Sequence, residues 1–406
     1  MERYAPYLES LASQAQSMSD LVVEWVQIPT PSYDLVGLAN FNEKIKTAFA
    51  PLNATIEELD LAPQKVVDYA GKLGEKKLGK ALRFRKRPEA KLQVFLGIHS
   101  DVVYGIESTV TPTLRLENGK LFASGATDAK GGLVIMLKAL ETFEASPFAE
   151  NVGWEVLINP DEELGSPGSK PYLVEAAGRN HLGLLFEPAL SNGNLVGARK
   201  GSGNFAAVIH GIAAHAGRDP HLGRNAIHAL GHLIVELELF GKNNPGININ
   251  VGKIEGGGAL NRVPDLAIAR FNLRVTDFAE QVRAEKFLSQ LSLDYSSRYD
   301  IQLEITGGFS SPPKPLTSKN VVLLETIKNC GKDLNLNLAW EESGGVSDGN
   351  KLAAAGLVNV DTLGAVGGNI HSPDEFLVLK SLVERSQLTA LFLMQLKPEM
   401  FSEKSH

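Results

Sequence analysis

The residues in this sequence best suited to chemistry are histidines and acids that lie beside strand-like or turn-like stretches. They are His99, Asp101, Asp128, Glu162, Glu163, Glu187 and His371. Two histidines and three carboxylates suffice to hold two zinc ions with one shared ligand, and a remaining glutamate is then free to handle a proton. Imidazole and carboxylate ligands are typical of catalytic zinc, whereas cysteines usually close a structural site. The chain has one cysteine, Cys330, so a structural zinc site is nearly excluded.

Composition places the chain among ordinary soluble globular proteins, with 406 residues, 43% hydrophobic and 21% charged. This length favours two domains. A net charge of −7 gives no global attraction to nucleic acid or anionic membrane. No apolar run approaches the roughly 18 residues that span a bilayer, and residues 1–20 lack the pattern of a secretory signal. With a lone cysteine, these features predict a cytoplasmic protein without nucleic-acid or membrane partners.

The candidate ligands stand where predicted strands end. Residues 92–98 form an apolar, β-branched run that ends at His99, and residues 182–186 form a short run that ends at Glu187. Residues 154–158 form a similar run shortly before the two adjacent glutamates, and residues 131–143 carry apolar side chains at helical spacing. Open α/β sheets bind ligands beyond the carboxyl ends of their strands. The ligand set and the fold pattern therefore agree.

The middle third of the chain follows a different pattern. It predicts strands at 204–210, 247–254, 266–275 and 301–305, with helices at 225–240 and 277–293. This β-α-β-β-α-β order is the ferredoxin-like split unit. We therefore expect an inserted second domain at residues 201–311, between the two parts of an α/β catalytic domain at residues 1–200 and 312–406.

Residues 72–91 are rich in lysine and arginine. A solvated connection or an edge hairpin is the favoured interpretation. A nucleic-acid patch is disfavoured because neither an aromatic platform nor a nucleic-acid-binding fold accompanies the charge.

An ordered set of short motifs runs from about residue 95 to 375. The segments are His99-Ser100-Asp101, Gly125 to Gly132, Asp161 to Ser166, Glu187-Pro188, His215 to Gly217, Asn261 to Pro264, Gly344 to Gly349, and His371. In this order they resemble the co-catalytic zinc exopeptidases, a family that includes glutamate carboxypeptidase, aminoacylase, acetylornithine deacetylase and succinyl-diaminopimelate desuccinylase. The glutamate carboxypeptidase branch is the most similar. The resemblance implies a mixed-sheet catalytic domain with an inserted ferredoxin-like lid and dimerisation domain.

The resemblance also implies roles for the ligands. His99 and Glu187 would hold one zinc ion, Glu163 and His371 the other, and Asp128 would bridge the two. Cobalt or manganese could substitute for zinc. Asp101 would orient the His99 imidazole, Glu162 would act as general base, and the Asp128–Ala129 peptide bond would be cis.

In the inserted domain, the resemblance gives His215 the task of stabilising the oxyanion in a partner subunit, with Asn261 near the same substrate. It therefore implies a homodimer. Arg274 is the expected clamp for a free carboxylate, because a guanidinium binds a carboxylate bidentately. Strand alternation places Arg274 on one face with Arg270 and Asn272.

One position departs from the glutamate carboxypeptidase pattern. That branch carries a second arginine near the end of the last strand of the lid, where this chain has Gly307-Gly308. Arg199-Lys200 could compensate. We expect a hydrolase of small peptides or N-acyl amino acids, most simply a carboxypeptidase, with an N-acyl amino acid deacylase or a dipeptidase as alternatives. A non-catalytic binding protein is the remote alternative, which the intact ligand set and Glu162 oppose.

Overall fold

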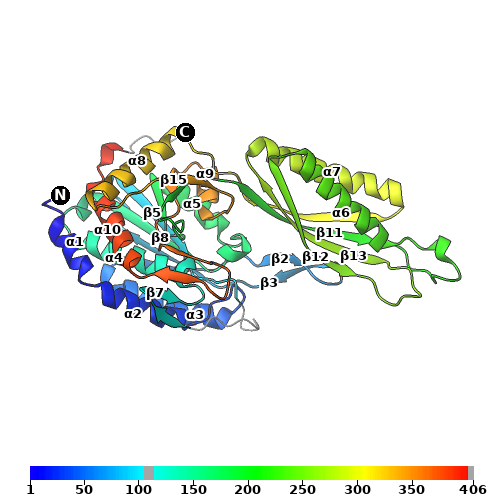
Figure 1. Ribbon diagram of the computed structural model, residues 1–406, viewed down its shortest axis with the longest axis horizontal. Helices are drawn as coiled ribbons and strands as arrows, with labels where there is room; N and C mark the ends of the chain where they lie inside the picture. The colour runs from blue at the N-terminus through cyan, green and yellow to red at the C-terminus, as the bar shows by residue number, and fades with distance from the viewer. Residues whose placement is uncertain (105–113, 401–406) are drawn as a thin grey trace.

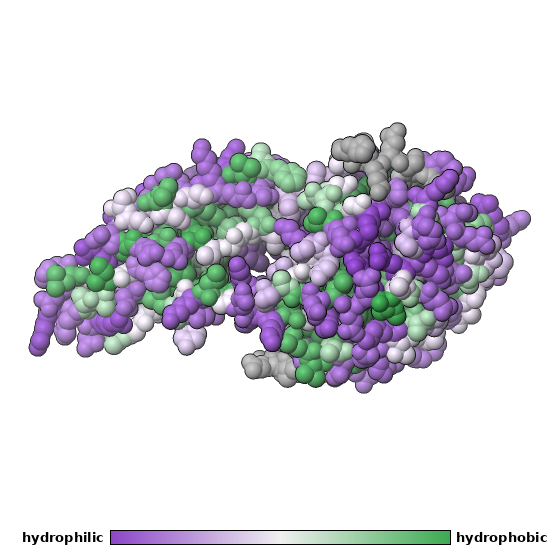
Figure 2. Space-filling view, turned by 180° about the vertical axis from the view of Figure 1, so that it is seen from behind, coloured by the Kyte–Doolittle hydropathy of each residue, from purple (hydrophilic) through white to green (hydrophobic). Residues whose placement is uncertain are grey.

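The computed structural model describes residues 1–104 and 114–400, which form two lobes joined by a narrower middle (Figure 1; Figure 2 shows the molecule from behind). We call residues 201–311 the lid lobe and the remainder the catalytic lobe. Both chain ends lie on the catalytic lobe (Figure 1). The domain boundaries proposed from the sequence stay predictions. Within the described ranges, no helix is long and apolar enough to cross a bilayer.

A six-stranded sheet forms the centre of the catalytic lobe. In spatial order its strands are β1 (Thr55–Leu59), β4 (Ala81–Lys86), β8 (Val152–Asn159), β5 (Leu92–His99), β9 (Leu182–Leu185) and β16 (Asn359–Val360). Strands β8, β5, β9 and β16 run parallel, whereas β1 and β4 pair antiparallel. The sheet is therefore mixed, and the expected α/β class is confirmed.

Helices cover both faces of this sheet. One face carries α1 (Ala5–Ala12), α2 (Ala15–Val26), α3 (Leu35–Phe49), α4 (Gly131–Glu144), α8 (Ser318–Asp333) and α10 (Lys380–Gln395), and the other carries α5 (Lys170–Arg179) and α9 (Asp348–Ala354). Side chains of β5 alternate between the two cores, with Val94 and Leu96 in the first and Phe95 in the second. A Cβ at Gly132 would lie 2.0 Å from the Phe186 carbonyl oxygen. Only glycine therefore lets α4 pass so close to the end of β9.

The lid lobe has the expected β-α-β-β-α-β order. Its elements are β11 (Gly201–His210), α6 (Ala226–Asn243), β12 (Ile247–Gly256), β13 (Leu266–Val275), α7 (Phe278–Tyr299) and β14 (Gln302–Ser311). The strands form an antiparallel sheet in the order β12-β13-β11-β14. Both helices pack on one face of this sheet around their own core, which includes Leu233, Leu273 and Leu288. The other face is left for the catalytic lobe.

The basic stretch at residues 72–91 divides into two different structures. Its first part is confirmed as a hairpin strand, since β3 (Leu73–Lys76) pairs with β2 (Gln64–Val67) and this hairpin extends toward the lid (Figure 1). Its second part corrects the prediction, because β4 is an inner strand of the large sheet with Leu82 and Phe84 fully buried. In this strand Arg83 and Arg85 both pair with Glu57.

Smaller strands surround the region of the candidate ligands. β10 (Leu195–Arg199) pairs with β15 (Trp340–Ser343), and a four-stranded sheet has the order β17 (Gly367–Gly368), β18 (Phe376–Val378), β7 (Lys120–Phe122) and β6 (Arg115–Glu117). The loop between β17 and β18 carries His371. In this way a residue late in the chain reaches the ends of the central strands.

Candidate metal centre

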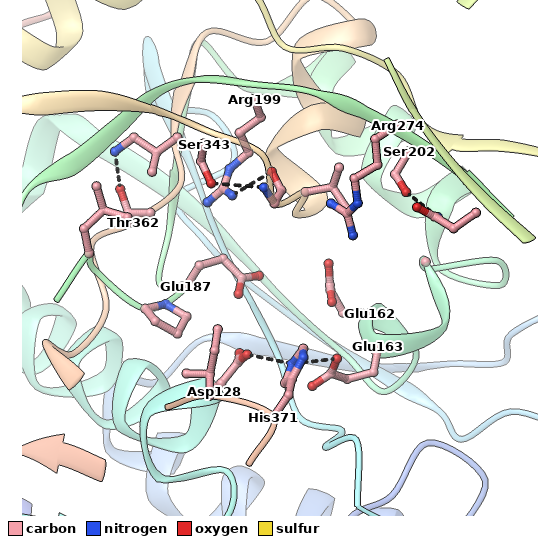
Figure 3. A pocket seen from close by; sticks show the side chains of 18 of the residues that line it. Asp128, Glu162, Glu163, Glu187, Arg199, Ser202, Arg274, Ser343, Thr362 and His371 are labelled. Carbon is pink, nitrogen blue, oxygen red and sulfur yellow. Dashed lines mark hydrogen bonds and ion pairs between the residues drawn. The ribbon is translucent and has the colours of Figure 1, made fainter. Parts of the chain in front are cut away.

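Five separate segments bring the candidate ligands together at one edge of the central sheet. His99 is the last residue of β5, Glu163 follows β8, and Glu187 follows β9. Asp128 lies in the turn that precedes α4, and His371 comes from the β17–β18 loop. Figure 3 shows Asp128, Glu163, Glu187 and His371 pointing toward a common space. Parallel strands bring their carboxyl ends to one edge, so the fold itself explains this convergence.

Asp128 occupies the middle of this cluster. One carboxylate oxygen lies 3.0 Å from Nε2 of His99, and the other lies 3.2 Å from Nε2 of His371. Glu187 Oε2 lies 3.6 Å from His99 Nε2, and Glu163 Oε2 lies 3.4 Å from His371 Nε2. The cluster therefore has two halves, each with one histidine and one glutamate, and Asp128 faces both.

Burial and charge make this cluster unfavourable by itself. Burial raises the pKa values of Glu163 and Glu187. Contacts with Asp128 and Glu163 raise the pKa of His371 to about 10. Burial opposes protonation of His99, but the carboxylates of Glu187 and its other neighbours outweigh it and raise its pKa. Three converging carboxylates and two imidazoles are the donor set that divalent transition-metal ions prefer, so the residues present fit two such ions.

The imidazole of His99 is fixed by a hydrogen bond to a main-chain oxygen. Its Nδ1 lies 2.9 Å from the Asp101 carbonyl oxygen and 3.4 Å from the Asp101 carboxylate. A carbonyl oxygen only accepts, so Nδ1 carries a proton, and Nε2 is the ring atom that faces the cluster and would bind a metal ion. Asp101 thus orients His99 mainly through its main chain.

The Asp101 carboxylate has a further task that the sequence did not reveal. It accepts hydrogen bonds from the main-chain N–H groups of Glu162 (3.1 Å) and Glu163 (3.2 Å), and from the Ser32 hydroxyl (2.7 Å). Residues 162–164 form one turn of 3-10 helix rather than an extended segment. The turn forms because the carboxylate satisfies the free N–H groups at its start.

The Glu162 carboxylate points into the open space beside the cluster (Figure 3). Burial and the Glu187 carboxylate raise its pKa well above the ordinary value. Behind the turn lies a buried ion pair, with Lys351 Nζ 2.9 Å from Asp348 Oδ1. The Asp348 carboxylate also accepts a hydrogen bond from the Ser166 hydroxyl just after the turn. The turn that carries Glu162 is therefore fixed by hydrogen bonds, while no hydrogen bond to the Glu162 carboxylate is found among residues 1–104 and 114–400.

Glu375 supports Asp128 and was missed by the sequence analysis. Its carboxylate accepts main-chain hydrogen bonds from Gly125 (3.0 Å), Thr127 (2.8 Å) and Asp128 (3.0 Å). Burial raises the pKa of Glu375 to about 7. The Asp128–Ala129 peptide bond is cis, as expected. In the sequence, Glu375 is simply an acid four residues after His371. No helical or strand pattern surrounds it, so its place in the fold could not be predicted.

A cavity of about 820 Å³ opens between the cluster and the lid lobe. Arg274 lines its far side and donates to the Gly344 carbonyl oxygen at 2.6 Å. Arg199 also lines it, but its guanidinium is held by two contacts of 2.8 and 3.0 Å to Asp361. Lys200 is not among the lining residues in the described ranges. Arg274 therefore presents the less committed guanidinium, and the use of Arg199 as a second arginine stays a prediction.

Two of the expected residues lie elsewhere. His215 and Asn261 are exposed and do not line this cavity in the described part of the chain. They lie close together, because the main chain bridges His215 to Arg262 and Ala216 N donates to the Asn261 carbonyl oxygen at 2.9 Å. The segment between β11 and α6 that carries His215 lies at the end of the lid lobe remote from the catalytic lobe (Figure 1).

A convergence of imidazoles and carboxylates beneath a second lobe is the arrangement of a metal-dependent hydrolase. Residues 95–395 match the family described as Peptidase family M20/M25/M40, and the chain belongs to that family. It is 30% identical over 337 residues to a succinyl-diaminopimelate desuccinylase from Hahella chejuensis, a match that covers 77% of this chain and 84% of that protein. The chain is therefore a metal-dependent amide hydrolase of this family, as the motifs predicted.

Solved structures share the whole fold at lower identity. A tripeptidase from Staphylococcus aureus is 24% identical with a TM-score of 0.73, covering 94% of this chain and 99% of that one. The dipeptidase Dug1p from Saccharomyces cerevisiae is 14% identical with a TM-score of 0.74, covering 98% of both chains. Both likenesses extend over the catalytic and lid lobes together.

Proposed function

We propose that this protein cuts an amide bond whose amine side carries a free carboxylate. The observation that carries the proposal is the position of Arg274, whose guanidinium faces the Asp128 cluster across one cavity (Figure 3). A guanidinium recognises a carboxylate through charge-assisted hydrogen bonds. The substrate is a small peptide that loses its C-terminal residue, as in a carboxypeptidase or a dipeptidase.

An N-acyl amino acid is the second candidate substrate, because the Hahella chejuensis relative is a desuccinylase. Both substrate classes release an amine that carries an α-carboxylate. Arg274 therefore has the same task in each, and the acyl side alone distinguishes them.

We assign His99 and Glu187 to one metal ion and Glu163 and His371 to a second, with Asp128 shared between them, on the distances described above. We propose zinc, with cobalt or manganese as substitutes, because imidazole and carboxylate ligands suit these ions. Such ions polarise a substrate carbonyl and lower the pKa of a water molecule.

Glu162 supplies the proton transfer. It accepts a proton from the water that attacks the carbonyl carbon and returns it to the leaving amine nitrogen. Its raised pKa makes it a better proton acceptor near neutral pH than an ordinary carboxylate. His215 of a partner subunit stabilises the oxyanion and Asn261 contacts the same substrate. A homodimer and a cytoplasmic location complete the proposal.

Metal content and substrate profiling test this function. Purified protein should bind close to two divalent ions per chain, and a panel of dipeptides and N-acyl amino acids should be hydrolysed. The methyl ester and the amide of the best substrate's carboxylate should be poor substrates. Equal rates for the free acid and the amide would contradict the assignment of Arg274. Binding of one ion or none under saturating zinc would contradict the assignment of the five ligands.

A further inference from the structure

A row of asparagines crosses the lid sheet on the side of the cavity. In the strand register, Asn250 of β12 pairs with Asn272 of β13, Asn272 pairs with Asn204 of β11, and Asn204 pairs with Gly308 of β14. Asn204, Asn250 and Asn272 all line the cavity that contains the Asp128 cluster. Side chains directly opposite one another in a sheet point to the same face, so the three amides form one continuous row.

Alternation along the strands separates this row from the lid core. The neighbours Phe205, Ile249 and Phe271 pack into the core beneath the helices. The asparagines therefore point away from the helices and toward the catalytic lobe.

The row keeps unused hydrogen-bonding capacity. Asn272 Nδ2 donates to Ser202 Oγ at 2.9 Å and to Asn204 Oδ1 at 2.8 Å, which holds these two side chains together. Across residues 1–104 and 114–400, no partner is found for the Asn250 side chain, for Asn272 Oδ1 or for Asn204 Nδ2. The row thus offers acceptors and donors to a ligand, and none of its groups carries charge.

Charged residues stand on either side of this row but leave it neutral. Arg274 is two residues along β13 from Asn272, about 7 Å away at the usual strand rise. Arg270, two residues the other way, is paired with Glu255 and donates to the Val67 carbonyl oxygen of the β2–β3 hairpin at 2.8 Å. Arg270 is therefore committed elsewhere. At Gly308, the end of the row, an added Cβ would meet nothing within 4 Å.

We propose that Asn204, Asn250 and Asn272 form a specificity subsite for an uncharged, hydrogen-bonding side chain such as a carboxamide. This inference rests on the proposed function: Arg274 holds the substrate's α-carboxylate, and the side chain of that same residue reaches the next row. A carboxamide matches the donors and acceptors of the row. An apolar side chain would leave them unpaired, and a second carboxylate finds no cation there.

The test compares three side chains of similar size. The N-acetyl and N-alanyl derivatives of glutamine, glutamate and methionine are assayed with the metal-loaded enzyme. In whichever series, N-acetyl or N-alanyl, is hydrolysed faster, kcat/KM for the glutamine derivative should exceed that for the methionine and glutamate derivatives by at least about tenfold. Asn250→Leu should lower the glutamine-to-methionine ratio of kcat/KM about tenfold. Asn243→Leu, an exposed change on α6 outside the cavity, should leave the ratio unchanged.

A gain of charge supplies the complementary test. Gly308→Arg places a guanidinium at the open end of the row, so the glutamate-to-glutamine ratio of kcat/KM should rise about tenfold or more. Gly307 is not an equivalent position, because its φ is +115° and its Cβ would lie 2.2 Å from the Asn204 carbonyl oxygen. An unchanged ratio in a folded Gly308→Arg protein would count against the row as the side-chain subsite.

The inference and the proposed function fail differently. Hydrolysis of all three side chains at equal rates, with the ratio unaffected by Asn250→Leu, overturns the subsite and leaves the proposed function standing. Absence of hydrolysis in both series contradicts the proposed function. In that case, calorimetry on the Glu162→Gln protein measures ligand affinity without hydrolysis and tests the subsite by binding alone. Tighter binding of N-acetyl-glutamine than of N-acetyl-methionine supports the subsite, and equal affinity overturns it.

Discussion

Two adjacent glutamates differ in what surrounds their carboxylates. Glu163 lies 3.4 Å from Nε2 of His371 within the cluster, whereas Glu162 points into the cavity (Figure 3). We expect Glu162→Gln to keep its metal and lose about 10²–10⁴-fold in kcat, because proton transfer is removed. Glu163→Gln should instead lower metal occupancy. Metal analysis beside kinetics separates the two, and equal metal loss in both variants would show that the roles are wrong.

Arg274 provides a second prediction at the scale of single residues. Charge-assisted hydrogen bonds are worth roughly 1.5–3 kcal/mol each, so Arg274→Ala should reduce kcat/KM at least about tenfold for substrates with a free carboxylate. Arg298→Ala is the matched control, because Arg298 is an exposed arginine of the lid lobe that pairs with Glu236 outside the cavity. A comparable loss in both variants would point to the total charge of the lid rather than to a clamp.

The sequence predicted the candidate metal ligands better than the residues that hold those ligands in place. All five candidate ligands lie together. Three of them follow strand ends, where residue type and position agree, and the ordered motifs supplied Asp128 and His371. Glu375 and the second task of Asp101 were missed, since both act on main-chain N–H groups, which no side-chain pattern reports. The asparagine row was also missed as a unit. Asn272 was placed on the face of Arg274, but Asn204 and Asn250 join it only through the register of three strands.

At the scale of elements, the sequence predicted the order of strands and helices well and their ends less well. β14 continues to Ser311 although the expected strand ended at residue 305. Gly307-Gly308 has the composition of a turn, but pairing with β11 keeps it extended. β4 was not predicted as an inner strand because Arg83 and Arg85, next to the buried Leu82 and Phe84, suggest an exposed segment. In the structure both arginines pair with Glu57, which allows this strand to lie inside the sheet.

The two crossings between the lobes are tied together by one side chain. Asn350 of α9 is fully buried, and its Nδ2 donates to the carbonyl oxygens of Lys200 (2.9 Å) and Pro312 (2.8 Å). Lys200 leads into β11, and Pro312 follows β14. This amide therefore reinforces a junction between the entering and leaving strands that the main chains of Arg199 and Lys314 also bridge.

Asn350→Leu keeps the branching and the number of heavy atoms of this side chain but removes both hydrogen bonds, together with the one that Asn350 Oδ1 accepts from the Ser347 main-chain N–H at 3.1 Å. Two buried carbonyl groups then lose a donor, so unfolding free energy should fall by about 2–4 kcal/mol. Urea titration and thermal unfolding measure the loss. Asn329→Leu on the exposed surface of α8 should change stability by less than about 0.5 kcal/mol. An Asn350→Leu protein as stable as the control would show that the tie contributes nothing.

At the scale of the whole molecule, the cavity is built from both lobes but not from the whole lid. Its lining includes Arg274 and the asparagine row, whereas His215 is exposed, and the β11–α6 segment that carries it lies at the remote end of the same lobe (Figure 1). Hydrophobic residues also reach the surface of the lid lobe in several places (Figure 2), and Leu260, next to Asn261, is fully exposed. A second copy of the chain would both cover such residues and bring His215 to a site that its own lobe does not reach.

Mixed dimers test this arrangement directly. In a twofold dimer with exchanged His215, a heterodimer of His215→Ala and Glu162→Gln chains contains one site with both residues intact. Two inactive homodimers should therefore recover about a quarter of wild-type activity after random exchange. Mixing Glu162→Gln with Glu163→Gln should restore nothing, because His215 is intact in both chains and every site keeps one defective glutamate. A fully active wild-type monomer, or verified His215→Ala/Glu162→Gln heterodimers without activity, would show that His215 does not cross between subunits.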